Sequence, residues 1–226
     1  MLFYLSIGDV LLRYQIIPVT AFAQNCSLVW CDQSMDAVLI DAGGDVELLR
    51  STVAANGVKL KAVWLTHGHL DHAGGAQDLR EQLGLPVIGP ATQDDFWLAG
   101  IEQQSQMYGL EGLRNVEPDE WLTEGRELTL GEETFQVFET PGHTPGHIIF
   151  YHPKQKLAWV GDVLFAGSIG RTDFPKGDHA TLISSITEKL WPLGKEVRFI
   201  PGHGPESTFG DEQKTNPFVS DSALGR

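Results

Sequence analysis

Histidine and aspartate side chains that can hold a metal ion gather in one short stretch of the chain. Three histidines and one aspartate fall within residues 67–72. Imidazole nitrogens and carboxylate oxygens are the common ligands of a catalytic zinc-type ion, which keeps one position open for water. Because side chains alternate along an extended loop, His67 and His69 point to the same side and can bind one ion. Asp71 shares their parity, whereas His72 begins a helix and can turn toward a neighbouring ion.

Three more candidate ligands, His143, Asp162 and His203, each lie at or just beyond the end of a predicted strand. Strand ends are places where a rigid sheet can direct several side chains at one point. The carboxylate of Asp162 can bridge two ions because its oxygens diverge, and two neighbouring ions can generate hydroxide and stabilise an oxyanion. The remaining histidines lack such neighbours. We predict structural roles for His147 and His152 and a surface position for His179.

The elements that must position these residues alternate between strands and helices in the first half and are mostly strands in the second. Apolar residues at helical spacing predict helices after Asp45 as N-cap, after His72, after a capping box at 92–95 and after Asp178. Two sheets packed together with helices outside would bury the apolar faces of both halves. Short apolar or β-branched runs bounded by turn residues predict strands at 14–19, 27–31, 37–40, 60–65, 86–88, 127–130, 134–139, 147–152, 157–160 and 197–200.

Length and composition are those of one globular domain. The chain has 226 residues, of which 42% are hydrophobic, and single α/β domains reach this size. We predict an N-terminal extension over 1–12 and one domain over 13–226. The net charge of −14 repels phosphate backbones and argues against nucleic acid as the substrate. A small anion remains possible as a ligand, because a metal site supplies its own local positive charge.

The sequence also predicts a soluble, cytoplasmic protein, and it leaves the oligomeric state open. The apolar run at 1–12 is too short to span a membrane and lacks the basic start of a signal peptide. Cys26 and Cys31 flank a strand-like run, and a strand of that length holds them too far apart for a disulfide. Two reduced thiols fit a reducing compartment.

Four motifs, taken in order along the chain, resemble those of the metallo-β-lactamase superfamily. They are Thr66-His-Gly-His-Leu-Asp-His, Pro141-Gly-His-Thr-Pro-Gly-His, Gly161-Asp162 and Pro201-Gly-His-Gly. Within that superfamily the chain is most similar to glyoxalase II, the hydroxyacylglutathione hydrolases, in their compact bacterial form. Residues 18–26 and 170–174 add to this likeness. The resemblance implies the α/β fold of that superfamily, a four-layer αββα sandwich.

The same resemblance implies a site for two divalent metal ions. Zinc is favoured, with iron and manganese as alternatives, because histidine and aspartate ligands suit all three. Asp162 would bridge the ions and act with Asp71 in catalysis, and Asp41 would stand behind the ligands and steady the histidine-rich turn. The implied ligands of the first ion are His67, His69 and His143. Those of the second ion are Asp71, His72 and His203.

The activity that the resemblance implies is hydrolysis of S-lactoylglutathione, or a similar glutathione thioester, to D-lactate and glutathione. Water that the metals convert to hydroxide would attack the thioester carbonyl, as in methylglyoxal detoxification. Larger glyoxalase II proteins bind glutathione with a helical domain after the last histidine ligand, but only 23 residues follow His203 here. We therefore predict Arg171, Lys176 and Tyr108 as substrate-binding residues.

Persulfide dioxygenases also resemble this chain, including residues 171–174, and provide an alternative function. They use a single iron and oxidise glutathione persulfide, so the metal count and oxygen uptake would separate them from a thioesterase. A β-lactamase is disfavoured, because Asp162 stands where those enzymes carry cysteine or serine. A metal-binding domain without catalysis is disfavoured as well, since a closed structural site needs only four ligands.

Overall fold

The N-terminal strands form the first of two large sheets in the computed structural model, which describes residues 12–225. Its five strands stand in sequence order. The first three pair antiparallel, and the third, fourth and fifth pair parallel. The strands are β1 (Leu12–Val19), β2 (Gln24–Cys31), β3 (Asp36–Ile40), β4 (Lys59–Trp64) and β5 (Val87–Ile88).

The second sheet has six strands in the order β13-β12-β9-β8-β7-β6, and only its β12 and β9 pair in parallel. These strands are β6 (Glu127–Leu130), β7 (Glu133–Glu139), β8 (Ile148–His152), β9 (Leu157–Gly161), β12 (Arg198–Pro201) and β13 (Ser207–Thr208). A small separate hairpin consists of β10 (Leu164–Phe165) and β11 (Ser168–Ile169).

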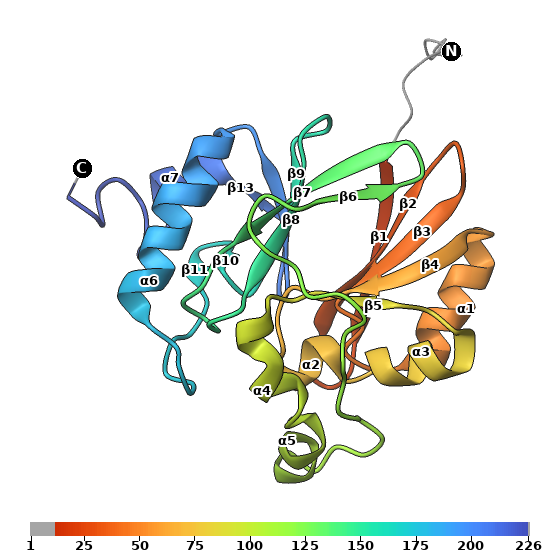
Figure 1. Ribbon diagram of the computed structural model, residues 1–226. Helices are drawn as coiled ribbons and strands as arrows, with labels where there is room; N and C mark the ends of the chain where they lie inside the picture. Colours follow the sequence, from red (N-terminus) through yellow and green to blue (C-terminus); the bar gives the residue numbers. More distant parts are fainter. Residues whose placement is uncertain (1–11, 226) are drawn as a thin grey trace.

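Helices connect the strands and lie outside both sheets, as Figure 1 shows. A π-helical turn (Ser185–Leu190) and a 3₁₀ turn (Trp191–Leu193) continue α6, and another 3₁₀ turn (Thr92–Asp94) precedes α4. The α-helices are α1 (Val46–Asn56), α2 (Leu70–Ala73), α3 (Ala76–Leu83), α4 (Asp95–Leu98), α5 (Ile101–Met107), α6 (His179–Ser184) and α7 (Phe209–Thr215).

Adjacent strand residues pack into different layers of the core, which creates four layers. In β8, Ile149 packs against the α6 side while its neighbour Phe150 packs between the two sheets. In β2, Leu28 packs against the helices that include α1, and Val29 packs between the sheets. Because both faces of these strands are covered, buried residues follow one another without the alternation of a half-exposed strand. The predicted four-layer αββα sandwich is confirmed.

Some local details differ from the sequence predictions. Asp45 does precede α1, but its backbone is left-handed (φ 49°) and its side chain does not cap the helix. Its carboxylate instead accepts a hydrogen bond of 2.6 Å from the backbone N–H of Thr20. The sequence analysis also missed the hairpin of β10 and β11, together with β13 and α7. The predicted extension at 1–12 lies outside the described residues except for Leu12, which begins β1.

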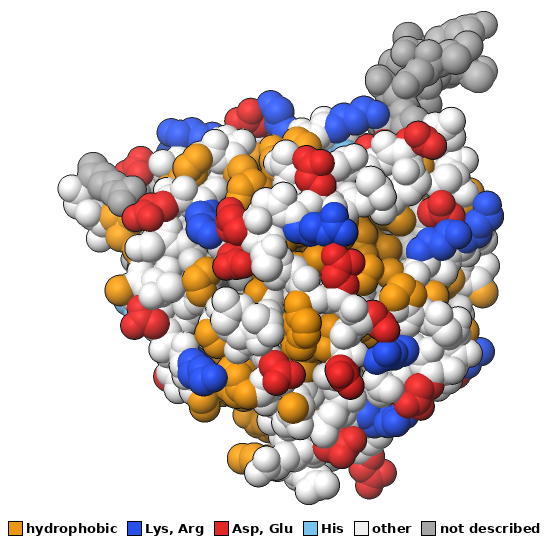
Figure 2. Space-filling view, viewed as in Figure 1, with side chains coloured by type: hydrophobic (Ala, Val, Ile, Leu, Met, Phe, Trp, Pro, Cys, Tyr) orange, Lys and Arg blue, Asp and Glu red, His pale blue; other side chains and the backbone are white. Residues whose placement is uncertain are grey.

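The two cysteines are buried and unpaired, as predicted. Burial raises the pKa of the Cys26 thiol well above 9.0, so this thiol is protonated and unreactive at neutral pH. Within residues 12–225, no helix combines the length and apolar character needed to cross a membrane. Figure 2 shows acidic and basic side chains interspersed on one face, so on that face the negative charge is not gathered into one patch.

The packing of α1 predicts different effects for two adjacent leucines. Leu49 is fully buried under the first sheet, whereas Leu48 is 45% exposed. We expect Leu49→Ala to lower the free energy of unfolding by about 2–5 kcal/mol, because it leaves a cavity in the core. Leu48→Ala is the matched control and should cost less than about 1 kcal/mol. Urea denaturation of both variants measures this, and equal losses would contradict the assignment of the buried face.

Candidate metal centre

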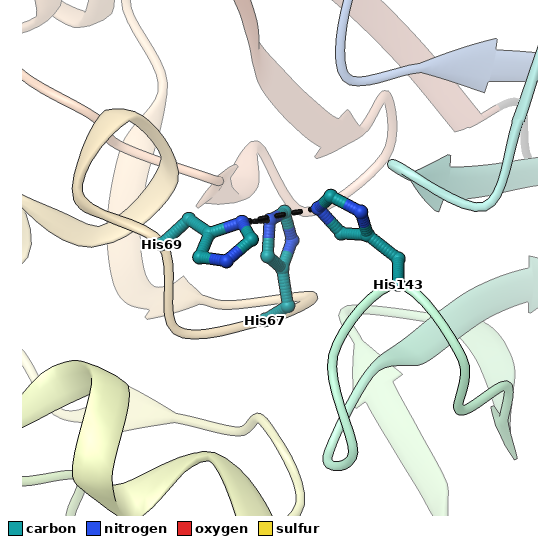
Figure 3. Close-up of side chains that lie close together, drawn as sticks. All are labelled: His67, His69 and His143. Atoms are coloured by element: carbon teal, nitrogen blue, oxygen red, sulfur yellow. Dashed lines mark hydrogen bonds between the residues drawn. The ribbon is translucent and has the colours of Figure 1, made fainter. Parts of the chain in front are cut away.

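The predicted ligands come together from both sheets, although up to 136 positions separate them. The turn at 67–72 follows β4 of the first sheet, and Asp162 and His203 follow β9 and β12 of the second. His143 lies in the loop between β7 and β8. Figure 3 shows His67 and His69 on one loop and His143 on another, with their rings directed at one another. The packing of the two sheets therefore assembles the cluster.

Three imidazoles form the first group of candidate ligands. The Nδ1 atom of His69 lies 3.1 Å from Nε2 of His67 and 3.0 Å from Nε2 of His143. All three rings are buried. Burial lowers the pKa of His67 well below 6.5 and that of His69 to about 3, so both rings are neutral at pH 7. Neutral imidazole is the form that binds a metal ion.

Asp71, His72 and His203 form the second group. The Oδ2 atom of Asp71 lies 3.2 Å from Nε2 of His203 and 3.9 Å from Nε2 of His72. Asp162 stands between the two groups. Its Oδ1 lies 3.3 Å from Nε2 of His72, and its Oδ2 lies 3.7 Å from Nε2 of His143 and 3.8 Å from Nε2 of His203. The two oxygens of one carboxylate thus face ligands of both groups.

Asp41 lies behind the turn at 67–72 and orients two of the candidate ligands that this turn carries. It accepts hydrogen bonds of 2.7 Å from the backbone N–H and the hydroxyl of Thr66. It also lies 2.9 Å from Nδ1 of His72, and the Thr66 hydroxyl lies 3.0 Å from Nδ1 of His67. These contacts favour a ring proton on the outer Nδ1 of both histidines and leave each Nε2 directed at the cluster.

His143 is oriented in the same way by the main chain, since its Nδ1 lies 2.7 Å from the carbonyl oxygen of Arg171. His147, predicted to be structural, lies directly behind the site. Its Nε2 accepts the backbone N–H of Asp162 at 3.1 Å, and its ring stacks on His67 with centroids 4.8 Å apart. His147 therefore holds Asp162, the predicted bridging residue, through its backbone. The remaining two histidines are elsewhere: His152 pairs with Glu133, and His179 is exposed at the start of α6.

Asp94 joins the two loops that carry the first group, and the sequence analysis did not single it out. Its fully buried carboxylate accepts hydrogen bonds from the backbone N–H groups of Gly68 (2.9 Å) and Gly146 (2.6 Å) and from the Thr144 hydroxyl (2.7 Å). Burial raises the pKa of Asp94 to about 6, so the carboxylate is still largely ionised at pH 7. In the sequence, Asp94 is one of several polar residues at a helix start, and that position hides its long-range role.

Gly202 permits the approach of the loop that carries His203. A Cβ atom at this position would collide with a carboxylate oxygen of Asp162 and lie 2.5 Å from Cε1 of His72. Only glycine therefore lets the chain after β12 pass this close to the ligands. The adjacent His203 is then held over Asp71.

The unsatisfied atoms of the cluster fit a bound cation. Nε2 of His72 and Oδ1 of Asp162 are buried without a hydrogen-bond partner. Although burial lowers it, the carboxylates of Asp162, Asp71 and Asp41 raise the pKa of His72 well above 6.5. The carboxylates thus attract positive charge to this point, and a divalent ion would supply it by taking the place of the proton on Nε2 of His72. The residues present fit divalent metal binding.

The cluster lies at the floor of a pocket of about 900 Å³. Arg171 and Tyr108, two of the predicted substrate residues, line it. Lys176 does not, although its ammonium lies 3.9 Å from the centre of the Phe96 ring, which does. The guanidinium of Arg171 forms hydrogen bonds of 2.6 Å to the carboxylate of Asp173, in a pair that is well exposed.

Comparisons with known proteins cover nearly the whole chain. A profile of the metallo-beta-lactamase superfamily matches residues 19–203. The hydroxyacylglutathione hydrolase GloC of Haemophilus influenzae is 46% identical over 210 residues, which make up 92% of this chain and 99% of the relative. The crystal structure of BLEG-1 B3 metallo-beta-lactamase has a TM-score of 0.84 at 37% identity, over 92% of this chain and 99% of its own. TTHA1623 in a di-iron-bound form has a TM-score of 0.83 at 36% identity, over 91% and 100%.

The grouping of the ligands predicts the metal content of a histidine variant. We expect His203→Ala to reduce the bound metal from about two ions per chain to about one, because the three-histidine group stays intact. His179→Ala is the matched control, since it removes an exposed histidine away from the cluster. Elemental analysis of the purified proteins measures this. Unchanged metal content in His203→Ala would show that this histidine is not a ligand.

The position of Asp94 predicts that its replacement by the neutral asparagine weakens the metal site, although Asp94 is not itself a candidate ligand. An amide in Asp94→Asn presents its NH₂ group to donors that need an acceptor, so we expect a loss of about 1.5–3 kcal/mol in unfolding free energy at neutral pH. Metal affinity should fall about 10–100-fold. The exposed neighbour provides the control, Asp95→Asn. Denaturation and competitive chelation measure the two effects, and equal behaviour of both variants would contradict this role.

Proposed function

The chain belongs to the metallo-beta-lactamase superfamily and is a metal-dependent hydrolase, and from this premise we propose that its substrate is a glutathione thioester such as S-lactoylglutathione. The products would be D-lactate and glutathione, as in the detoxification of methylglyoxal. The name of the Haemophilus influenzae relative supports this substrate class. The observation that carries the proposal is the pair of ligand groups that share Asp162 at the floor of a pocket of about 900 Å³.

Two divalent ions would occupy the site, one in each group, with Asp162 between them. The di-iron-bound form of a relative at 36% identity supports the number, and zinc, iron and manganese all accept this set of nitrogen and oxygen ligands. When bound, such ions lower the pKa of a water molecule and polarise a carbonyl group. The chain supplies the geometry through its own side chains and through the groups that hold them.

The ionised carboxylates mark where a water molecule can give up a proton. Asp71 and Asp162 are both directed at the space between the groups. Asp41, Thr66 and the carbonyl of Arg171 keep the imidazoles from rotating, so the site needs little rearrangement during reaction. The thiol product can leave as a thiolate, because a thiol with a pKa of about 8.5 gives an anion that is a weak base and a good leaving group.

Arg171 is the residue that we assign to the glutathione end of the substrate. Its guanidinium stands at the pocket wall, and its carboxylate partner within residues 12–225, Asp173, forms an exposed pair with it. Exposed ion pairs contribute little free energy, so a substrate carboxylate can compete for this group. Tyr108 lines the same pocket and is 55% exposed, which leaves its hydroxyl available to a ligand. Lys176 would act only at the outer rim, over Phe96.

The cell compartment that fits this activity is the cytoplasm. Glutathione is the abundant thiol of reducing compartments, and the two buried cysteines are unpaired.

The proposal predicts metal-dependent thioesterase activity. Stripping the protein with a chelator should reduce S-lactoylglutathione hydrolysis at least about a hundredfold, and added zinc, iron or manganese should restore it. Asp162→Asn should not respond to added metal. Loss of thioester absorbance and release of free thiol measure the reaction. Full activity in protein shown to be metal-free would refute the proposal. Oxygen uptake with glutathione persulfide, without thioester hydrolysis, would establish the dioxygenase alternative.

A further inference from the structure

His203 is held in a different way from other histidines of the cluster. It lies between Gly202 and Gly204, and its side chain is 31% exposed. Glycine has more backbone freedom than any other residue, so this loop does not fix the ring by its own stiffness. The position of His203 therefore depends on contacts from outside the loop. By contrast, contacts to the outer nitrogen, Nδ1, fix the rings of His67, His72 and His143.

Asn25, near the start of β2 in the first sheet, supplies those outside contacts. Its side-chain NH₂ group donates hydrogen bonds to the carbonyl oxygens of Pro201 at 3.1 Å and of Gly204 at 2.8 Å. Its backbone N–H donates to the carbonyl oxygen of Gly202 at 2.8 Å. The three acceptors lie on both sides of His203 in the chain. One residue of the first sheet thus brackets a ligand that the second sheet carries.

The residue before His203 is also bonded to the second sheet. The backbone N–H of Gly202 donates to the carbonyl oxygen of Gly161 at 2.8 Å, and Gly161 directly precedes Asp162. Two successive hydrogen bonds therefore run from β2 through Gly202 to the end of β9. They join the two sheets directly beside the metal cluster. If the contacts from Asn25 were lost, His203 would be free to move relative to Asp162.

The chemistry of an amide side chain matches this place. An amide NH₂ group carries two donor hydrogens, and at Asn25 two carbonyl oxygens accept from it. A carboxylate of the same shape has only acceptors and would face the same two oxygens without a donor. Asn25 is not among the residues that line the pocket. Any effect of its side chain on the reaction therefore passes through the loop of His203.

We propose that Asn25 is a positioning residue, which sets the affinity of the second metal position by fixing His203. The inference rests on the two-ion arrangement of the proposed function. The three-histidine group of the first position takes no ligand from this loop. Loss of the Asn25 amide therefore weakens the binding of one ion and leaves the other in place.

Two variants, Asn25→Ala and the isosteric Asn25→Asp, remove the two side-chain donors. We expect the affinity for one zinc ion to fall about 10–100-fold and the affinity for the other to change less than about threefold. Competition with a chromophoric chelator, together with elemental analysis, measures both steps. Asn56→Asp is the matched control, because Nδ2 of Asn56 also donates to a backbone carbonyl, that of Thr52 at 2.9 Å, at the end of α1 and outside the cluster.

Excess metal separates a positioning role from a general loss of structure. With stoichiometric zinc, hydrolysis of S-lactoylglutathione by Asn25→Ala should fall in proportion to the emptied second position. Saturating zinc should return kcat to within about threefold of the wild-type value, because the ligand itself is still present and mass action refills the position. A kcat that stays low while two ions are bound would overturn a role through metal affinity.

A measurement on the unaltered chain makes the test independent of whether the variants fold. Metal-stripped, isotopically labelled protein is titrated with zinc and followed by nuclear magnetic resonance. The side-chain NH₂ signals of Asn25 should change together with the ring signals of His203 and separately from those of His69, whichever position fills first.

The possible results distinguish this inference from the function on which it rests. Unchanged affinities for both ions in the two Asn25 variants, equal losses of both ions, or Asn25 signals that follow His69 would each overturn the positioning role. A wild-type chain that binds a single ion would refute the two-ion arrangement and this inference with it. Failure of thioester hydrolysis in a chain that binds two ions would refute the proposed substrate alone, since the metal measurements do not depend on it.

Discussion

A buried cluster of imidazoles and carboxylates is the constraint on which this structure depends. Such groups would lose much of their hydration without compensation, unless a cation accepts their lone pairs. The chain meets this requirement by fixing the outer side of several rings: Asp41 and Thr66 hold two of them, and the carbonyl of Arg171 holds a third. The inner nitrogens are then aligned before any ion arrives. Preorganisation of this kind is what allows a metal site to stabilise developing charge.

Ligands from both sheets tie metal binding to the packing of the sandwich. The turn at 67–72 belongs to the first sheet, and His143, Asp162 and His203 belong to the second. Asp94 reinforces this junction, because it holds Gly68 on one side and Gly146 on the other. An ion bound here contacts both halves of the domain and stabilises the folded chain over the unfolded one. Loss of the sheet interface and loss of the site should therefore occur together.

The sequence brought out the candidate ligands and Asp41 behind them, but not the other residues that hold them. A run such as 67–72 is recognisable because three histidines in six residues have no role in a solvated loop. The strands of both sheets, apart from the two-residue β13, were also predictable, since strands such as β8 and β9 consist of continuous buried and mostly apolar residues. The contacts of Asp94, and those of His147 within its predicted structural role, were not predictable, because their partners lie elsewhere in the sequence and their types are common at helix starts and in strands. Short elements such as β10, β11 and β13 carry too few residues to show a pattern.

Arg171 has two roles, one for its backbone carbonyl and one for its side chain. Its backbone carbonyl orients His143, while its guanidinium stands at the pocket wall. A carbonyl is present whatever the side chain, so substitutions here can alter which molecules are recognised and leave the orientation of the imidazole intact. A substitution at this position can therefore change the substrate specificity without first abolishing catalysis. Such a separation makes the pocket wall evolvable in a way that the ligands are not.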